Sequence, residues 1–130
     1  MGKARPQAVV LDSGALIAFE RADARMRALL REAIASGARL VIPAGVVGQV
    51  FRDRARQVPL CSLLRSKHSF VPPLDRTLAE AAGSLCGRAG TSDVVDASVV
   101  LVARREHAPV ITSDIDDLRA LDPSLKLERI

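Results

Sequence analysis

The sequence predicts an α/β fold in which helices cover both faces of a central parallel sheet. Short apolar runs typical of buried strands alternate along the chain with longer amphipathic segments typical of helices. Strands that alternate with helices pair in parallel, because each connection crosses back over the sheet. The length of 130 residues fits one domain, and neither a repeat nor a linker interrupts the alternation. We therefore expect a single domain over residues 1–130.

Local signals define the elements of the first half of the chain. We expect strands at Ala8–Leu11 and Leu40–Ile42, and helices at Ser13–Glu20, Asp23–Ser36, from Pro43 to about Arg52, and Leu60–Ser66. The strands are short and wholly apolar, as buried strands are. Gly37 is well placed to end the second helix, and Pro43 suits the first turn of the third.

The same alternation continues to the end of the chain. We expect strands at Ser69–Val71 and Val110–Thr112, an edge strand at Leu125–Arg129, and helices from Asp75 to Arg88, from Thr91 or Ser92 to about Glu106, and at Asp116–Leu121. Asp75 and either Thr91 or Ser92 are the expected N-caps, and Gly87 or Gly90 is expected to end the earlier helix.

Composition narrows the classes of function. Hydrophobic residues make up 48% of the chain, which is enough for a core, and the net charge of +4 favours a polyanionic partner such as RNA. With three Phe and neither Trp nor Tyr, binding of nucleic acid by aromatic stacking is disfavoured. No apolar run approaches the roughly 20 residues of a membrane span, and the start Met1–Gln7 lacks a signal-peptide core. Cys61 and Cys86 are expected to be reduced thiols, so we expect a cytoplasmic protein.

Two aspartates follow directly on predicted strands. Asp12 comes after Ala8–Leu11, and Asp114 comes two residues after Val110–Thr112. The carboxyl ends of parallel strands share one edge of the sheet, where ligands bind in open α/β folds. Each residue has an alternative role, because Asp is also a good N-cap for the helix that follows.

Asp96 is harder to explain by structure alone. It lies in an apolar helical stretch, Val94–Ala103, that contains no basic residue before Arg104. A buried carboxylate must be paired, protonated or bound to a metal. Asp93 lies at i−3 on the same helix face, although a favourable interaction with the helix dipole would explain it equally well. Asp116 and Asp117 carry the same ambiguity at the start of the last helix.

Carboxylates that converge from different elements repel one another unless a cation holds them. Oxygen ligands without Cys or His suit Mg²⁺ or Mn²⁺, and such an ion activates water for phosphodiester hydrolysis. The alternative, a metal-independent ribonuclease that uses His68 and His107, has little support in the sequence. Ser13 and Ser113 lie beside the acids without a nucleophile-elbow motif, so they are expected to bond backbone or metal-bound water.

Three segments resemble the motifs of PIN-domain ribonucleases, in the same order and spacing over almost the entire chain. They are Val9-Val10-Leu11-Asp12-Ser13-Gly14-Ala15-Leu16-Ile17-Ala18, Asp93-Val94-Val95-Asp96-Ala97-Ser98-Val99-Val100, and Val110-Ile111-Thr112-Ser113-Asp114-Ile115-Asp116-Asp117-Leu118. The short length resembles the VapC toxins in particular. The resemblance implies a three-layer α/β/α sandwich and a Mg²⁺-dependent endoribonuclease (with Mn²⁺ as the other candidate ion). It also implies a homodimer that is inhibited by a cognate antitoxin.

The resemblance assigns roles to individual residues. It implies that Asp12, Asp96 and Asp114 are catalytic and hold the metal, with Asp93 and Asp116 as further candidate ligands and Ser13, Gln49 and Thr112 in support. One position departs from the family pattern, because Gln49 stands where these enzymes usually have a Glu. An amide oxygen still coordinates or orients water but contributes no charge, so metal affinity and activity are in question. Asp53, or less favourably Glu20, is a candidate to replace the missing acid.

Basic residues near Gln49 are expected to form an electrostatic cradle for RNA, although a solvated basic face would explain any one of them. They are Arg52, Arg54, Arg56, Arg65 and Lys67. Because of Gln49, a catalytically silent RNA-binding or regulatory module is the alternative function. A receiver-like domain is disfavoured, because neither its acidic pair before the first strand nor its Lys after a late strand is found. Other α/β phosphohydrolases are disfavoured, because Gly14 stands where they have a second Asp.

Overall fold

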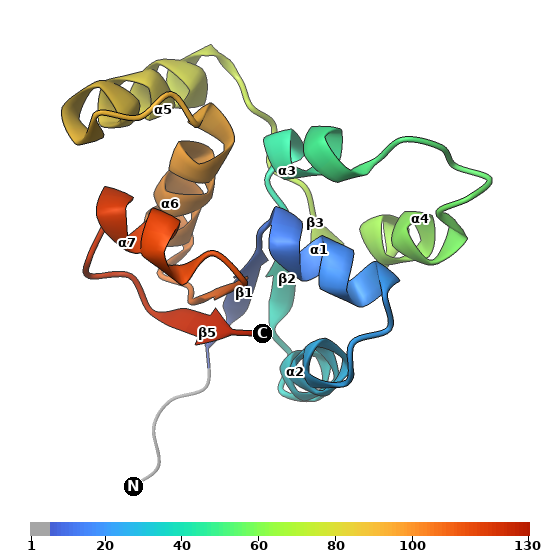
Figure 1. Ribbon diagram of the computed structural model, residues 1–130. Helices are drawn as coiled ribbons and strands as arrows, with labels where there is room; N and C mark the ends of the chain where they lie inside the picture. The colour runs from blue at the N-terminus through green and yellow to red at the C-terminus, as the bar shows by residue number, and fades with distance from the viewer. Residues whose placement is uncertain (1–5) are drawn as a thin grey trace, which may run out of the picture.

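A five-stranded parallel sheet forms the centre of the computed structural model, which describes residues 6–130 (Figure 1). The strands are β1 (Ala8–Leu11), β2 (Arg39–Val41), β3 (Ser69–Phe70), β4 (Val110–Thr112) and β5 (Leu127–Arg129), in the spatial order β3-β2-β1-β4-β5. The predicted parallel α/β fold is therefore confirmed. The segment Met1–Gln7 was considered above for a signal peptide. Its first five residues lie outside the described residues.

Seven helices connect the strands within residues 6–130. They are α1 (Ser13–Glu20), α2 (Ala24–Ala35), α3 (Ala44–Val50), α4 (Val58–Arg65), α5 (Arg76–Ala89), α6 (Val94–Glu106) and α7 (Ile115–Leu121). The connections place α1, α2 and α4 on one face of the sheet and α5, α6 and α7 on the other, as Figure 1 shows. The predicted three-layer arrangement is the result.

Register brings the carboxyl ends of the two central strands together. Val10 of β1 is in register with Val41 on one side and with Val110 on the other, and Leu11 is in register with Ile111. The side chains of these strand residues are buried. Residues that directly follow β1 and β4 therefore lie side by side at one edge of the sheet.

Helix ends differ from the sequence prediction at one important place. Neither Thr91 nor Ser92 caps α6; the side chain of Asp93 does so by accepting a hydrogen bond of 2.9 Å from the backbone nitrogen of Asp96. Gly90 adopts a φ of 72° at the end of α5, and the chain needs the three following residues to turn into α6. The cap therefore falls later than predicted, and Asp96 lies in the first turn of the helix.

Asp122 is a buried acid that the sequence analysis did not identify. It is 6% exposed in the connection between α7 and β5, and its Oδ2 accepts a hydrogen bond of 2.7 Å from Nε of Arg104 on α6. Hydrogen bonds from Ser124 and from Arg104 hold the pKa of Asp122 below its ordinary value. This ion pair ties the last part of the chain to α6. No helix in residues 6–130 is long and apolar enough to cross a bilayer.

Candidate active site

Asp12 lies at the carboxyl end of β1, where it is only 2% exposed. Its Oδ1 accepts a hydrogen bond of 2.9 Å from the backbone nitrogen of Ala15, so the capping role considered for it is real. Burial raises the pKa of Asp12, and hydrogen bonds from Thr112 and Ala15 offset this only in part. Asp12 is thus a fixed carboxylate in a position where its charge is unfavourable.

Asp96 lies in the first turn of α6 and faces several other acids. Asp96 is half-buried because it lies near the start of the helix, and not fully buried as the apolar sequence around it had suggested. Burial, the charge and hydrogen bond of Asp93, and the charges of Asp114 and Asp12 raise the pKa of Asp96 to about 7. The charges of acids from the ends of β1 and β4 and from the start of α6 therefore act on Asp96.

Asp114 precedes α7 and is exposed. Its side chain makes no capping hydrogen bond to the helix, in contrast to Asp12. Its backbone nitrogen donates a hydrogen bond of 2.7 Å to Oγ1 of Thr112, which fixes the turn after β4. Its negative charge raises the pKa of both Asp12 and Asp96.

A hollow of about 210 Å³ opens beside Asp96. It is lined by Ala89, Thr91, Asp93, Asp96, Asp117, Ala120 and Leu121. Asp117, for which the sequence left a ligand role and a helix-dipole role open, lines this hollow, whereas the candidate ligand Asp116 does not line it; both residues are exposed. The signal in the sequence was the spacing: Asp117 lies three residues after Asp114, as Asp96 lies three after Asp93.

We call the end of the sheet that carries Asp12 and Asp114, with Asp96 at the start of α6, the acidic edge. Gln49 contacts this edge through a serine. The hydroxyl of Ser13, the residue after Asp12, donates a hydrogen bond to Oε1 of Gln49 on α3. The two acids considered as replacements are engaged elsewhere. Asp53 accepts from the backbone nitrogen of Ala55 at 3.0 Å and pairs with Arg56, and Glu20 accepts from the side chain of Gln57 at 3.1 Å.

The residues at this edge fit a divalent ion that keeps part of its water shell. Among residues 6–130, no three acidic, His or Cys side chains are close enough to enclose a metal ion by themselves. Mg²⁺ usually binds through one or two carboxylates together with water and substrate phosphate, so a closed protein cage is not required. The mutual repulsion that raises the pKa of Asp96 would be relieved by a cation.

The predicted basic cradle is divided by the structure. All five residues are exposed, but of these five only Arg54 and Arg65 line a common hollow.

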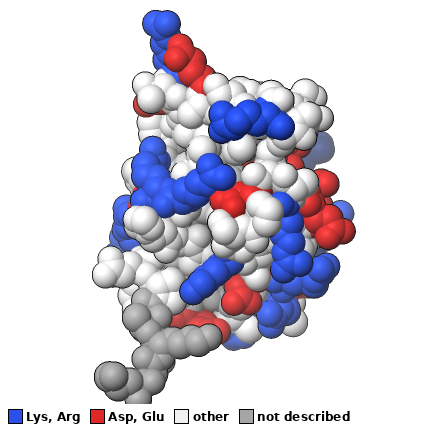
Figure 2. Space-filling model, turned by 90° about the vertical axis from the view of Figure 1, so that its left-hand side faces the viewer, with Lys and Arg blue, Asp and Glu red and all other residues white. Residues whose placement is uncertain are grey.

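On another face of the molecule, which includes α5 and α7, Lys and Arg side chains are interspersed with Asp and Glu (Figure 2), so this face offers no continuous basic track.

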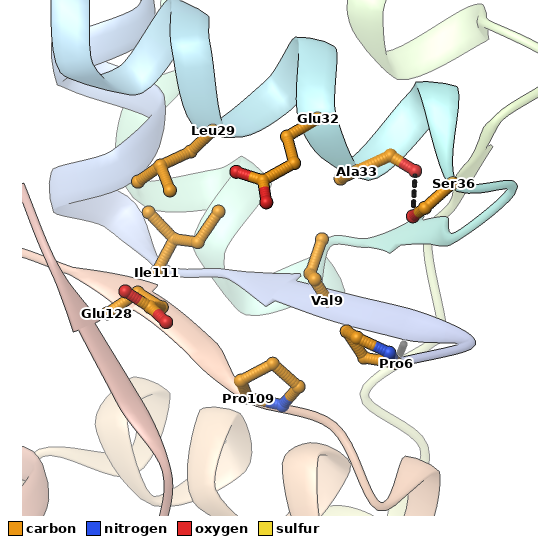
Figure 3. A pocket seen from close by; sticks show the side chains of 9 residues that line it. All are labelled: Pro6, Val9, Leu29, Glu32, Ala33, Ser36, Pro109, Ile111 and Glu128. Carbon is orange, nitrogen blue, oxygen red and sulfur yellow. Dashed lines mark hydrogen bonds between the residues drawn. The ribbon is translucent and has the colours of Figure 1, made fainter. Parts of the chain in front are cut away.

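A second depression lies away from the acidic edge and does not resemble a catalytic site. It is a cleft of about 180 Å³ beneath α2, with Val9 and Ile111 of the sheet at its floor (Figure 3). Glu32 and Glu128 extend into it from opposite walls, and the Ser36 hydroxyl is already bonded to the carbonyl of Ala33. This negative, largely apolar cleft would repel a polyanionic substrate.

Comparison with known proteins agrees with this geometry. A family model described as the PIN domain matches residues 9–122. No curated protein sequence matches the chain. Among solved structures, the fold is similar to VapBC2 from Rickettsia felis bound to a DNA fragment from their promoter, with 17% identity, a TM-score of 0.69, and coverage of 95% of this chain and 98% of that one.

Two further structures have a similar fold. FitAB bound to an IR36 DNA fragment shares 16% identity at a TM-score of 0.64, with coverage of 93% of this chain and 94% of the other. FitAcB from Neisseria gonorrhoeae shares 17% identity at a TM-score of 0.63, with coverage of 92% and 95%. At these identities, the similarity establishes the fold.

Proposed function

Because the chain belongs to the PIN domain family, we propose that it is a metal-dependent endoribonuclease that acts as the toxin of a toxin–antitoxin pair. The observation that carries the proposal is the placement of Asp12 and Asp114 after neighbouring strands and of Asp96 in the first turn of α6, where burial, Asp93, Asp114 and Asp12 raise the pKa of Asp96 to about 7. Partly buried carboxylates whose charges repel one another are unfavourable for folding unless a cation offsets them, which supports a cation site here.

The proposed reaction is the hydrolysis of an RNA phosphodiester bond. Asp12, Asp96 and Asp114 would hold Mg²⁺ or Mn²⁺, which polarises a phosphoryl oxygen and lowers the pKa of the attacking water when bound. Asp12 is fixed by Ala15 and Thr112, and the backbone of Asp114 is fixed by Thr112. Thr112, which is buried, therefore helps to fix the side chain of Asp12 and the backbone of Asp114. The Ser13–Gln49 pair supports the same edge from α3.

The experiment replaces each acid by its amide. Asp12→Asn, Asp96→Asn and Asp114→Asn are each expected to abolish cleavage of a labelled RNA in Mg²⁺ and to weaken Mn²⁺ binding in calorimetry. Glu32→Gln makes the same chemical change at the cleft beneath α2, away from these three acids, and is the control. Folding is checked by circular dichroism. Full activity in one of the three variants would remove that residue from the proposed site.

A silent RNA-binding module is the second candidate, and the neutral Gln49 favours it. The two functions differ in one result: the silent module binds RNA but does not cleave it in Mg²⁺ or Mn²⁺, whatever RNA is offered. Restoration of cleavage by Gln49→Glu would show that the wild-type residue is the cause of the silence.

The proposed partner is a cognate antitoxin, and the proposed assembly is a homodimer in the cytoplasm. The similarity of the fold to VapBC2 and FitAB supports a protein partner, and the free thiols of Cys61 and Cys86 are consistent with a reducing compartment. A short open reading frame beside the gene, with a product that copurifies with this chain and inhibits cleavage, is the expected result. Light scattering of the purified chain measures the dimer.

A further inference from the structure

A hollow of about 430 Å³ lies on the outer side of α4, apart from the acidic edge. It is lined by Arg54, Val58, Cys61, Ser62 and Arg65. The last four are spaced at i, i+3, i+4 and i+7, so they form one stripe along the helix. Leu60 and Leu63 on the opposite side of α4 are buried in the core. The stripe is therefore a presented surface on a helix that is anchored from behind.

The loop that carries Arg54 is held in place by one side chain. Oε1 of Gln57 accepts hydrogen bonds from the backbone nitrogens of Arg52 and Asp53, at 2.7 and 3.0 Å. Its Nε2 donates to the carbonyl of Val50 at 3.0 Å and to the carboxylate of Glu20 at 3.1 Å. These bonds tie the loop to the ends of α3 and α1. Arg54 thus starts from an ordered backbone, which reduces the entropy lost when its side chain binds a ligand.

Arg54 and Arg65 differ from the other arginines of this region in being uncommitted. Nη1 of Arg52 donates to the carbonyls of Gly48 and Phe51, at 2.9 and 2.7 Å, and Arg56 pairs with Asp53 at 3.6 Å. Neither Arg54 nor Arg65 forms an ion pair with any acid in the part of the chain that the structure describes. Two free guanidinium groups beside a serine hydroxyl suit a phosphate, which accepts paired hydrogen bonds from Arg.

We propose that this hollow binds a backbone phosphate of the RNA strand at a distance from the scissile bond, with Arg54 and Arg65 as its ligands and Ser62 as a further donor. The inference rests on the proposed ribonuclease function. The carboxylates at the acidic edge repel phosphates, so an RNA strand needs positive charge elsewhere to stay bound. The hollow supplies that charge where an ordered backbone presents it.

The distance between the acidic edge and the hollow on α4 is short. Ser13 at the start of α1 contacts Gln49 at the acidic edge, and Glu20 at the end of α1 contacts Gln57 beside the hollow. Eight residues of helix are roughly 12 Å long at about 1.5 Å per residue. A single RNA strand that lies along α1 would therefore reach from the acidic edge toward α4. The hollow would then bind a phosphate on one side of the scissile bond.

The test compares two double variants that each remove two positive charges from the same region. Arg54→Ala/Arg65→Ala removes the proposed ligands, and Arg52→Ala/Arg56→Ala removes the committed pair. Binding of a fluorescent single-stranded RNA is measured by anisotropy in EDTA, so that cleavage plays no part. The first variant is expected to bind about tenfold more weakly, with a shallower dependence on salt, and the second is expected to bind nearly as the wild type does.

Cys61 offers a local readout, because it lines the hollow and is partly exposed, while Cys86 is buried. RNA is expected to slow alkylation of Cys61 in the wild type and in Arg52→Ala/Arg56→Ala, but not in Arg54→Ala/Arg65→Ala. Alkylation of Cys86 serves as the internal reference. Equal weakening by both double variants, or no protection of Cys61, would overturn the proposal, as would failure of the wild type to bind RNA.

Two other outcomes separate this inference from its premise. If RNA binding depends on Arg54 and Arg65 but no cleavage occurs in Mg²⁺ or Mn²⁺, the phosphate site stands and the proposed catalytic function fails. If poly-glutamate protects Cys61 as well as RNA does, the hollow recognises an acidic protein surface and the assignment to RNA is overturned.

Discussion

A carboxylate in the first turn of a helix is ordinarily favourable, because the helix dipole attracts it. Asp96 occupies such a position but faces Asp93, Asp114 and Asp12, and it is half-buried. Repulsion and loss of hydration outweigh the dipole, and the pKa of Asp96 rises to about 7 against an ordinary value of 3.8. The metal-free protein therefore carries an unfavourable charge at neutral pH.

Replacing Asp96 by Asn is expected to stabilise the metal-free protein at pH 8. An acid with a raised pKa in the folded state contributes its stability fully below the unfolded value of 3.8, and that contribution is lost as the pH rises through about 7. The gain in unfolding free energy should thus be largest at pH 8 and vanish near pH 4, as measured by urea unfolding in EDTA. Glu32→Gln, at the cleft beneath α2, is the control, and an equal gain for Asp96→Asn at both pH values would contradict this explanation.

Gln49 is the position where charge is missing relative to the family pattern. Gln49→Glu adds a negative charge at the acidic edge, where Ser13 already places the side chain. Two unit charges about 4 Å apart interact by on the order of 4 kcal/mol at a dielectric near 20. Gln49 is exposed, so solvent screens much of this, but even a third of it is about a tenfold change in affinity.

We expect Gln49→Glu to tighten Mn²⁺ binding about tenfold and Gln49→Ala to weaken it slightly. Asp53→Asn should leave it unchanged, because Asp53 is bonded to Ala55 and Arg56 within its own loop. Calorimetric titration of the three variants measures these effects. Unchanged affinity in Gln49→Glu would mean that α3 does not face the metal.

Single residues were predictable from the sequence to the extent that local spacing determines their surroundings. Asp12 and Asp114 were predicted from strand ends, and in the structure they follow the neighbouring strands β1 and β4. Asp117 lines the hollow beside Asp96 and Asp116 does not, because the orientation of α7 decides which of the two side chains faces it. Asp122 was missed because its partner, Arg104, lies 18 residues earlier on another helix. Contacts that tertiary packing creates leave no local signal.

At the scale of elements, the sequence predicted every strand and helix of the described residues to within a few positions. Errors lie at the ends. The helix predicted to begin at Leu60 begins at Val58, because Pro59 is tolerated in its first turn. The cap of α6 is Asp93 and not Thr91 or Ser92, although all three are good caps. Which of several capping residues is used depends on the path of the preceding turn.

Gly14 controls how closely α1 approaches the turn after β4. A Cβ at this position would clash with the hydroxyl of Ser113 and come within 3.3 Å of the Ser113 backbone nitrogen. The hydroxyl can rotate away, but Ser113 Cβ and the backbone nitrogen, at 3.2 and 3.3 Å, would have to shift by a few tenths of an ångström, and with them the turn that carries Asp114. Gly14→Ala is therefore expected to weaken Mn²⁺ binding and slow RNA cleavage by about tenfold, as a small displacement in an active site does.

Gly48→Ala on α3 is the matched control for Gly14→Ala. No atom lies within 4 Å of a Cβ built at Gly48, so Ala should raise helix stability by up to about 1 kcal/mol. Metal binding should stay as in the wild type. If both variants bind Mn²⁺ normally, the close approach at Gly14 does not position the site.

At the scale of the whole molecule, the sheet separates the two sets of residues that were considered for RNA cleavage, the aspartates and the histidines. Asp12 and Asp114 follow β1 and β4 at the carboxyl edge, whereas His68 and His107 precede β3 and β4 at the opposite edge. In the order β3-β2-β1-β4, β3 and β4 are three strand spacings apart, which is roughly 14 Å at about 4.8 Å each. The histidines therefore cannot act as an acid–base pair on one phosphate.

This separation predicts the products of the reaction. Water that is activated by a metal leaves a 5′-phosphate and a 3′-hydroxyl, whereas attack by the 2′-hydroxyl of the RNA leaves a cyclic phosphate and needs no metal. EDTA should abolish cleavage, and mass spectrometry of the fragments should find 5′-phosphates. The double variant His68→Gln/His107→Asn should keep the wild-type rate; Asn is chosen because His107 has a φ of 50°, which Asn tolerates. Cyclic phosphate formed in EDTA, and lost in this variant, would reject the metal-dependent mechanism and assign the chemistry to the histidines.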